Sequence, residues 1–255
     1  MRKLFFLLVL LTSVNILYAV SSTEFPDEKF KEGTELYISG KYQEALEIWL
    51  SIYNSGFRSA NLNYNIGNAF FKLNDIPHAI LFYERALLLK PADEDISYNL
   101  QVARTFVVDK FVEVPEFFIV TWFNFIALII SSNTWAIISI ISFVLFLSLL
   151  SVCLFSSVYR IKVITFWCAV VMFLISGSSL AFSLRNKRLV TDSGKAIIMS
   201  PQVNGKSSPD ASGTDLFLIH EGTKVTVTDN VGNWYEIRLP DGNKGWVTSN
   251  SLEKI

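Results

Sequence analysis

The feature that most constrains this chain is a stretch without any charged residue, which runs from position 117 to position 159. Two apolar segments, residues 134–154 and 163–184, each match the roughly 20 residues that a helix needs to cross a bilayer. Arg160 and Lys162 are the only charged residues between them. One such segment is compatible with the buried helix of a soluble protein, but two adjacent ones favour a transmembrane hairpin whose short turn covers residues 155–162.

A shorter apolar segment, residues 117–130, precedes the hairpin and is followed by a polar Ser-Ser-Asn sequence. At about 14 residues it suits a helix that lies in the membrane interface better than one that spans it. Trp122 and Trp135 would then lie at the level of the lipid headgroups. We therefore assign residues 109–133 to a connector with an interfacial segment. If the segment spanned instead, the two ends of the chain would lie on opposite sides.

Residues 1–19 have the features of a secretory signal peptide. Arg2 and Lys3 precede an apolar run, and the segment ends at the small residue Ala19. No cysteine follows Ala19, so a lipoprotein anchor is not indicated. The alternative is an uncleaved signal that remains as an anchor.

These segments together predict the membrane topology. A cleaved signal exports the following region, and a two-helix hairpin returns the rest of the chain to the same side. We expect a bacterial inner-membrane protein with two spans and with both of its other regions in the periplasm. The basic residues in the turn agree with the positive-inside rule, whereas Arg185, Lys187 and Arg188 conflict with it.

The region between the signal and the connector, residues 20–108, contains an internal repeat. Small residues recur at one constant spacing, and aromatic residues follow them, as in the pairs Gly33/Gly67, Ala45/Ala79 and Trp49/Tyr83. This pattern resembles the tetratricopeptide (TPR) repeat, in which small residues let two helices cross closely. Pro91 ends the second copy, and residues 95–108 are expected to form a capping helix.

TPR arrays bind peptides or partner helices in a concave groove, so the resemblance implies a binding site. Asn65, Asn68 and Lys72 fall on the helix face that lines this groove in the family. We expect them to contact the backbone or a carboxylate of a partner. The alternative for Asn68 is that asparagine is simply common at this position of the repeat.

The C-terminal region, residues 190–255, has the short strands and glycine-containing turns of a small all-β domain. The pattern around His220-Glu221-Gly222-Thr223, Asp241-Gly242 and Gly245-Trp246-Val247 resembles the bacterial SH3 family. Residues 204–214 are expected to form an exposed loop. Five strands are expected, at residues 195–199, 216–219, 223–228, 234–239 and 245–247.

The resemblance implies a barrel that binds peptides or cell-wall material without catalysis. Trp234, Tyr235 and Trp246 are candidates for an aromatic binding face. Alternatively, Trp234 and Trp246 pack the barrel, and we favour this for Trp246. We expect His220 to end a strand rather than to bind a ligand.

The predicted fold class is therefore a multi-domain membrane protein: an all-α TPR solenoid, a two-helix transmembrane hairpin and a small all-β SH3-like barrel. This order of parts, with Asp109 and the segments 115–118 and 132–136, resembles the BatE-type proteins of the bacterial aerotolerance operon. The resemblance implies that this protein works together with sister membrane proteins that carry metal-binding von Willebrand A domains.

Composition argues against several functions. A formal net charge of −1 gives no basic field for nucleic acid. The chain has two histidines, its two cysteines lie in apolar stretches, and it has no glycine-rich phosphate loop. We therefore expect no enzymatic activity, cofactor or metal site, and the leading function is that of a scaffold whose partners are other membrane proteins and membrane lipid. The alternative is a protein that binds or senses the cell wall (peptidoglycan) through its β domain.

Overall fold

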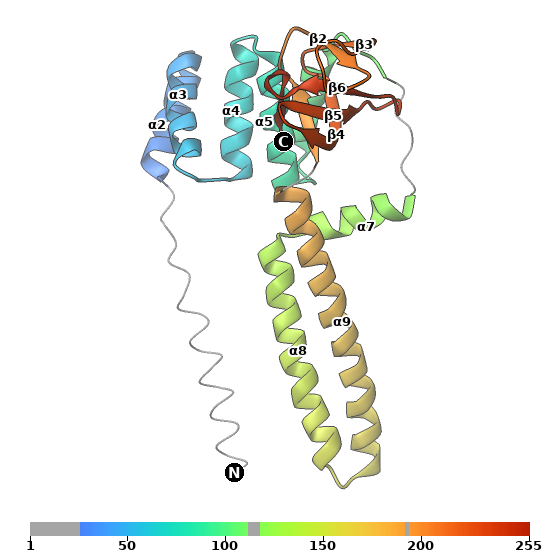
Figure 1. The fold of residues 1–255 in the computed structure, drawn as a ribbon. Helices are drawn as coiled ribbons and strands as arrows, with labels where there is room; N and C mark the ends of the chain where they lie inside the picture. The colour runs from blue at the N-terminus through green and yellow to red at the C-terminus, as the bar shows by residue number, and fades with distance from the viewer. Residues whose placement is uncertain (1–25, 112–117, 192–193) are drawn as a thin grey trace.

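The computed structural model describes residues 26–111, 118–191 and 194–255. In these residues eight helices precede seven strands, and they form a helical N-terminal region, two long apolar helices and a C-terminal antiparallel sheet (Figure 1). The predicted signal peptide lies outside the described residues. The helical region and the sheet both lie at the same end of the long hairpin.

The helical region consists of two helix pairs and a fifth helix. Short polar side chains start three of the helices: the side chains of Ser59, Asp75 and Asp93 accept hydrogen bonds from backbone N–H groups in the first turn that follows. The five helices are α2 (Asp27–Ile38), α3 (Tyr42–Asn54), α4 (Ala60–Lys72), α5 (Ile76–Leu89) and α6 (Glu94–Thr105).

The same close contact occurs at equivalent positions of both helix pairs. A Cβ atom at Gly33 would lie 2.6 Å from the indole nitrogen of Trp49, and a Cβ atom at Gly67 would lie 2.7 Å from the ring of Tyr83. Trp49 and Tyr83 are both 1% exposed. Glycine is therefore required at both positions because the aromatic ring of the second helix occupies the space of a side chain.

Three helices form the apolar part of the molecule: α7 (Phe118–Ile129), α8 (Ser132–Phe155) and α9 (Tyr159–Thr191). Helices α8 and α9 are long and apolar enough to cross a membrane by length and composition. The turn between them is shorter than predicted, since residues 159–162 already belong to α9. Helix α9 also continues past position 184 into the first residues that we assigned to the β region.

Serine side chains join α8 to α9 in two reciprocal pairs. The Ser139 hydroxyl donates to the carbonyl oxygen of Ser176 at 2.9 Å, and the Ser176 hydroxyl donates back to that of Ser139 at 3.0 Å. Ser132 and Ser183 repeat this exchange at 3.0 and 2.9 Å. Serine side chains are small enough to let the two backbones approach closely, and their hydroxyl groups find hydrogen-bond partners across the pair. This is typical of helices that pack in a membrane.

The C-terminal region is one antiparallel sheet with the strand order β3-β2-β6-β5-β4-β1-β7. Two of its strands were not predicted, and the expected loop at 204–214 is wrong at its start because residues 204–206 belong to β2. The strands are β1 (Lys195–Ile198), β2 (Gln202–Lys206), β3 (Asp215–His220), β4 (Lys224–Val231), β5 (Trp234–Arg238), β6 (Lys244–Thr248) and β7 (Leu252–Lys254).

Close packing explains why β2 resembles a loop in the sequence. A Cβ atom at Gly205 would lie 2.1 Å from the ring of Phe217, which covers the strand. The same ring lies 2.8 Å from the position of a Cβ atom at Gly245. Gly205 therefore serves the packing of an aromatic ring rather than a turn.

The helical region and the β domain pack against each other through their cores. Ile197 of β1 is fully buried in the hydrophobic cluster of the helical region, and Met199 and Ile255 pack against that cluster. Phe111, which follows α6, packs in turn against the core of the β domain. The two regions therefore form one continuous body above the hairpin.

Candidate functional site

A pocket of roughly 300 Å³ lies on the face of the helical region where α2, α4 and α6 present their side chains. Aromatic and amide side chains dominate its surface, with one cation at its edge. The lining residues are Tyr37, Tyr64, Asn68, Phe71, Lys72, Tyr83, Asn99 and Val102. We call this pocket the groove site. Its mixture of rings and amides suits an extended peptide better than a small charged metabolite.

Asn68 is the polar centre of the groove site. Its Oδ1 atom accepts a hydrogen bond from the Tyr83 hydroxyl at 2.7 Å and another from the Asn99 amide at 2.9 Å. The Asn99 amide also donates to the Tyr64 hydroxyl at 2.9 Å. These bonds tie α4, α5 and α6 together, so Asn68 has a structural role in the wall of the groove as well as a place on its surface.

The structure brings Asn68 and Lys72 together in the groove site, but Asn65 is not part of its lining. Asn65 is half-buried one turn before Asn68. Lys72 is exposed and makes no ion pair with any residue that the structure describes, so its ammonium group faces the solvent at the edge of the groove.

Tyr37 and Tyr83 of the groove site are held as neutral hydrogen-bonding groups. Burial raises the pKa of Tyr83 well above its usual value, with the nearby Tyr64 and Tyr37 adding to the effect. Burial also raises the pKa of Tyr37, with contributions from Tyr42 and Tyr64. Their hydroxyl groups therefore act as donors and acceptors toward a bound chain at neutral pH.

A second polar cluster lies where α5 meets the β domain. Glu84 is 4% exposed, and its carboxylate binds the Lys224 ammonium at 2.6 Å and the Arg104 guanidinium at 2.5 Å. Burial alone would raise the pKa of Glu84, but Lys224 and Arg104 outweigh it and lower the pKa below its usual value. The buried carboxylate is therefore ionised and joins the helical region to the sheet.

The next residue of α5 extends this connection to the end of the chain. The Arg85 guanidinium binds the Glu253 carboxylate at 3.0 Å and donates to the Lys254 carbonyl oxygen at 2.5 Å. Arg85 of α5 thus binds the edge strand β7. We call this set of interactions, with that around Glu84, the docking seam.

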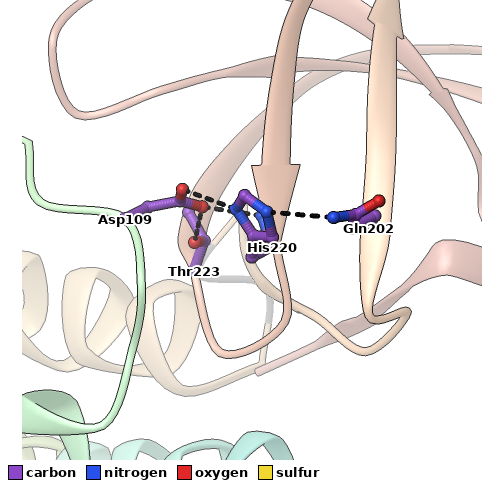
Figure 2. A network of polar contacts seen from close by, with 4 residues as sticks. All are labelled: Asp109, Gln202, His220 and Thr223. Carbon is purple, nitrogen blue, oxygen red and sulfur yellow. Dashed lines mark hydrogen bonds and ion pairs between the residues drawn. The ribbon is translucent and has the colours of Figure 1, made fainter.

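Asp109 and His220 form the third part of the docking seam (Figure 2). The Asp109 carboxylate accepts hydrogen bonds from the His220 backbone N–H at 2.7 Å, the His220 Nδ1 at 2.9 Å and the Thr223 hydroxyl at 2.6 Å. Burial would raise the pKa of Asp109, but these bonds outweigh it and lower the pKa. His220 does end a strand, and its ring holds the segment after α6 to the turn after β3.

The tight turn between β3 and β4 also belongs to the docking seam. Gly222 has a φ of +80°, and a Cβ atom there would lie 2.9 Å from Val107 and 3.3 Å from Ile80 of the helical region. Glycine is needed both for the left-handed backbone and for the close approach.

The three aromatic residues predicted for a binding face do not share one face of the sheet. Trp246 pairs with Glu236, and Trp234 lies two residues before Glu236, so both tryptophans lie on the outer face of β5 and β6. Tyr235 lies on the opposite face and packs against the core of the β domain. The expectation that Trp246 packs inside a barrel is wrong, because the buried Gly245 and Val247 take the inward positions beside it.

The strand pattern from β2 to β7, with glycine turns at Gly222, Gly232 and Gly242, can now be compared with known families. Residues 203–253 match the family model of the bacterial SH3 domain. No curated protein matches the chain. The SH3 domain match begins inside β2, so β1, whose Ile197 packs into the helical region, lies outside it. One strand that contacts the helices is thus outside the matched module, whereas Lys224 and Glu253 of the docking seam lie within it.

Several residues of these sites were missed from the sequence, and one of them had a detectable signal. Asn99 lies one repeat period after Asn65, so extending the repeat into α6 would have found it. Glu84, Lys224 and the pair of Asp109 with His220 connect segments far apart in the chain, and no local pattern indicates them. The described residues contain no group of three or more metal-binding side chains.

Proposed function

We propose that this protein is a non-catalytic adaptor, anchored in the bacterial inner membrane, that presents a TPR-type peptide-binding groove and an SH3 domain on the periplasmic side. The observation that carries the proposal is the groove site, which lies open on a helical region that is itself fixed to the SH3 domain at one end of an apolar hairpin. Two helix pairs with the same glycine–aromatic contact, one repeat period apart, support a TPR-type assignment.

The groove site supports recognition of an extended partner segment. Asn68 and Asn99 place amide groups among three tyrosines, which is a surface suited to a peptide backbone. Lys72 at its edge favours a partner carboxylate. Because the SH3 domain docks on α5, through Lys224 of β4 and Lys254 of β7, rather than over the groove, both surfaces are available to partners at once.

The rigid docking of the two modules supports an adaptor role. Two surfaces held in one body on a membrane raise the effective concentration of one bound partner for the other. The resemblance to BatE-type proteins makes sister membrane proteins with von Willebrand A domains the partners to test first.

Lys72→Glu is the variant that tests the groove most cleanly, because Lys72 is exposed and contributes to neither the helix contacts nor the docking seam. We expect the variant to co-purify several-fold less of its partner membrane proteins from solubilised membranes. Lys29→Glu, an exposed change in α2 and outside the groove lining, is the control and should retain them. Full recovery of partners with Lys72→Glu would contradict the proposed use of the groove.

A second candidate function is binding of cell-wall material by the SH3 domain. Trp234 and Trp246 favour it, because they lie half-buried on the same outer face of β5 and β6, where rings can stack on sugars. The test is sedimentation of the detergent-solubilised full chain with purified peptidoglycan. Binding that is lost in a Trp234→Ala, Trp246→Ala variant would support this function, and no sedimentation of the parent chain would contradict it.

A further inference from the structure

Helix α7 leaves a stripe of large apolar side chains uncovered. Trp122, Phe125 and Ile129 follow one another at spacings of three and four residues, which places them on one side of the helix. Their exposed fractions are 63%, 57% and 57%. The helix contains no charged residue. A surface of this kind requires a cover in a folded protein.

The opposite side of α7 is fastened to α9. The Arg185 guanidinium donates to the Asn124 side chain at 2.9 Å, and the ring of Phe123 lies 4.9 Å from that of Phe182. Ala127, on the same side, is fully buried. The stripe therefore points away from the hairpin, and its direction is fixed by these contacts.

The end of α7 is also capped by side chains of the hairpin. The buried Asn186 amide donates to the carbonyl oxygens of Ala127 and Ile130 at 2.9 and 3.0 Å. The Trp135 indole donates to the same Ala127 carbonyl at 3.1 Å. These bonds satisfy the carbonyl groups that a helix leaves open at its C-terminus. Helix α7 is thus a built element and not a loose linker.

The position of α7 indicates what covers the stripe. Figure 1 shows α7 extending to one side of the hairpin, at the end where the helical region and the SH3 domain lie. Helices α8 and α9, like the stripe, expose large apolar side chains. Arg185, Lys187 and Arg188 stand at this end of α9. Apolar side chains beside cations match the boundary between acyl chains and phosphates.

We propose that the stripe of α7 is a membrane-binding surface that lies in the interface of the same bilayer that the hairpin spans. This inference rests on the proposed membrane anchor. It gives a physical reason for the three basic residues on the periplasmic side, since they would bind lipid phosphates there.

Spin labels in the full chain test the proposal. Cys153 and Cys168 are first replaced by alanine, and single cysteines are introduced at Trp122, Phe125 and Ile129. The protein is reconstituted in vesicles of phosphatidylethanolamine and phosphatidylglycerol. We expect oxygen to collide with these labels more often than a water-soluble nickel complex does. Val120→Cys, on the side of α7 away from the stripe, is the matched control and should show the reverse order.

Two further labels separate the possible outcomes. Ile141→Cys on α8 reports the span, and Ser207→Cys in the SH3 domain reports water. If the nickel complex reaches the labels of the stripe as readily as it reaches Ser207→Cys, the proposal is overturned. It is also overturned if the labels of the stripe are protected from both oxygen and nickel, because the stripe would then be covered by protein. If Ile141→Cys itself is accessible to nickel, the membrane anchor of the proposed function fails instead.

Discussion

The two helix pairs of the N-terminal region have the same internal contact but different surroundings. In the first pair, Trp49 over Gly33 is followed by Leu50 and Ser51, which carry no charge. In the second, Tyr83 over Gly67 is followed by Glu84 and Arg85, which bind the SH3 domain. The two copies of the repeat thus share their packing and differ in their outward role.

The same glycine–aromatic packing motif therefore accompanies different roles in the two helix pairs. The glycine–aromatic contact closes each helix pair, and this is a matter of size and shape. The positions next to the aromatic residue are free to vary, and in the second pair they form the docking seam. Tyr83 itself also donates to Asn68 in the groove site, whereas the Trp49 indole donates to the Phe30 carbonyl oxygen within its own pair.

The largest effect is expected at the docking seam. Glu84→Gln leaves Lys224 and Arg104 without their carboxylate, and breaking a buried pair in this way costs about 3–5 kcal/mol. Since the Arg104 side chain is 43% exposed, we expect a smaller loss here, roughly 2–3 kcal/mol. Chemical denaturation of the full chain in detergent, monitored by tryptophan fluorescence, measures this loss in the free energy of unfolding. Glu44→Gln, an exposed change in α3, should leave the curve in place.

The second prediction compares the two glycines. Leucine at either position overpacks a helix pair, at about 1–3 kcal/mol. Gly67→Leu should cost more than Gly33→Leu, because a Cβ atom at position 67 also approaches the Ala79 backbone oxygen at 3.3 Å. The hydrogen bond to Asn68 also holds Tyr83 in place, so its ring moves aside less readily for a larger side chain. Melting curves of the two variants decide the order, and an equal loss in both would remove the distinction between the pairs.

A change in pH is expected to have a smaller effect on stability, and this effect again arises in the second helix pair alone. The hydrogen bond that the His78 ring donates to the Asp75 carboxylate raises the pKa of His78 above its usual 6.5. A raised pKa in the folded state gives stability that is complete below about 6.5 and is lost as pH rises through the folded value. We expect the melting temperature to fall slightly from about pH 6 to about pH 8, with less than about 1 kcal/mol involved because the pair is partly exposed.

His78→Gln removes the titrating group of that pair and should flatten the pH dependence in this window. Position 44, the equivalent in the first pair, is glutamate, so the first pair has no imidazole to titrate. A slope that persists unchanged in His78→Gln would show that another group causes it.

The main parts of the fold could be predicted from the sequence because each has a periodic or compositional signal. The period of the repeat predicted helix pairs, and the charge-free stretch predicted two long apolar helices, both of which the structure contains. The SH3-like pattern is confirmed over residues 203–253. Strand β2 was missed because Gly205 has the composition of a turn, while its actual role is to accommodate Phe217.

The candidate site was predictable only in part. Asn68 and Lys72 follow from the position of the repeat, and the structure places both in the groove site. The hydrogen bonds of Asn68 to Tyr83 and Asn99 depend on how three helices meet, which the spacing of one helix does not give. The docking seam depends on contacts between residues more than a hundred positions apart, such as Asp109 and His220.

In the proposed topology, the helical region and the SH3 domain lie together outside the cell membrane, with the hairpin turn inside. In a chain without its two native cysteines, single cysteines at the exposed positions Ser51, Ser207 and Ser157 test it directly. In intact spheroplasts, an impermeant thiol reagent should label Ser51→Cys and Ser207→Cys but not Ser157→Cys, which should react only after lysis. Labelling of Ser51→Cys without Ser207→Cys would contradict the account.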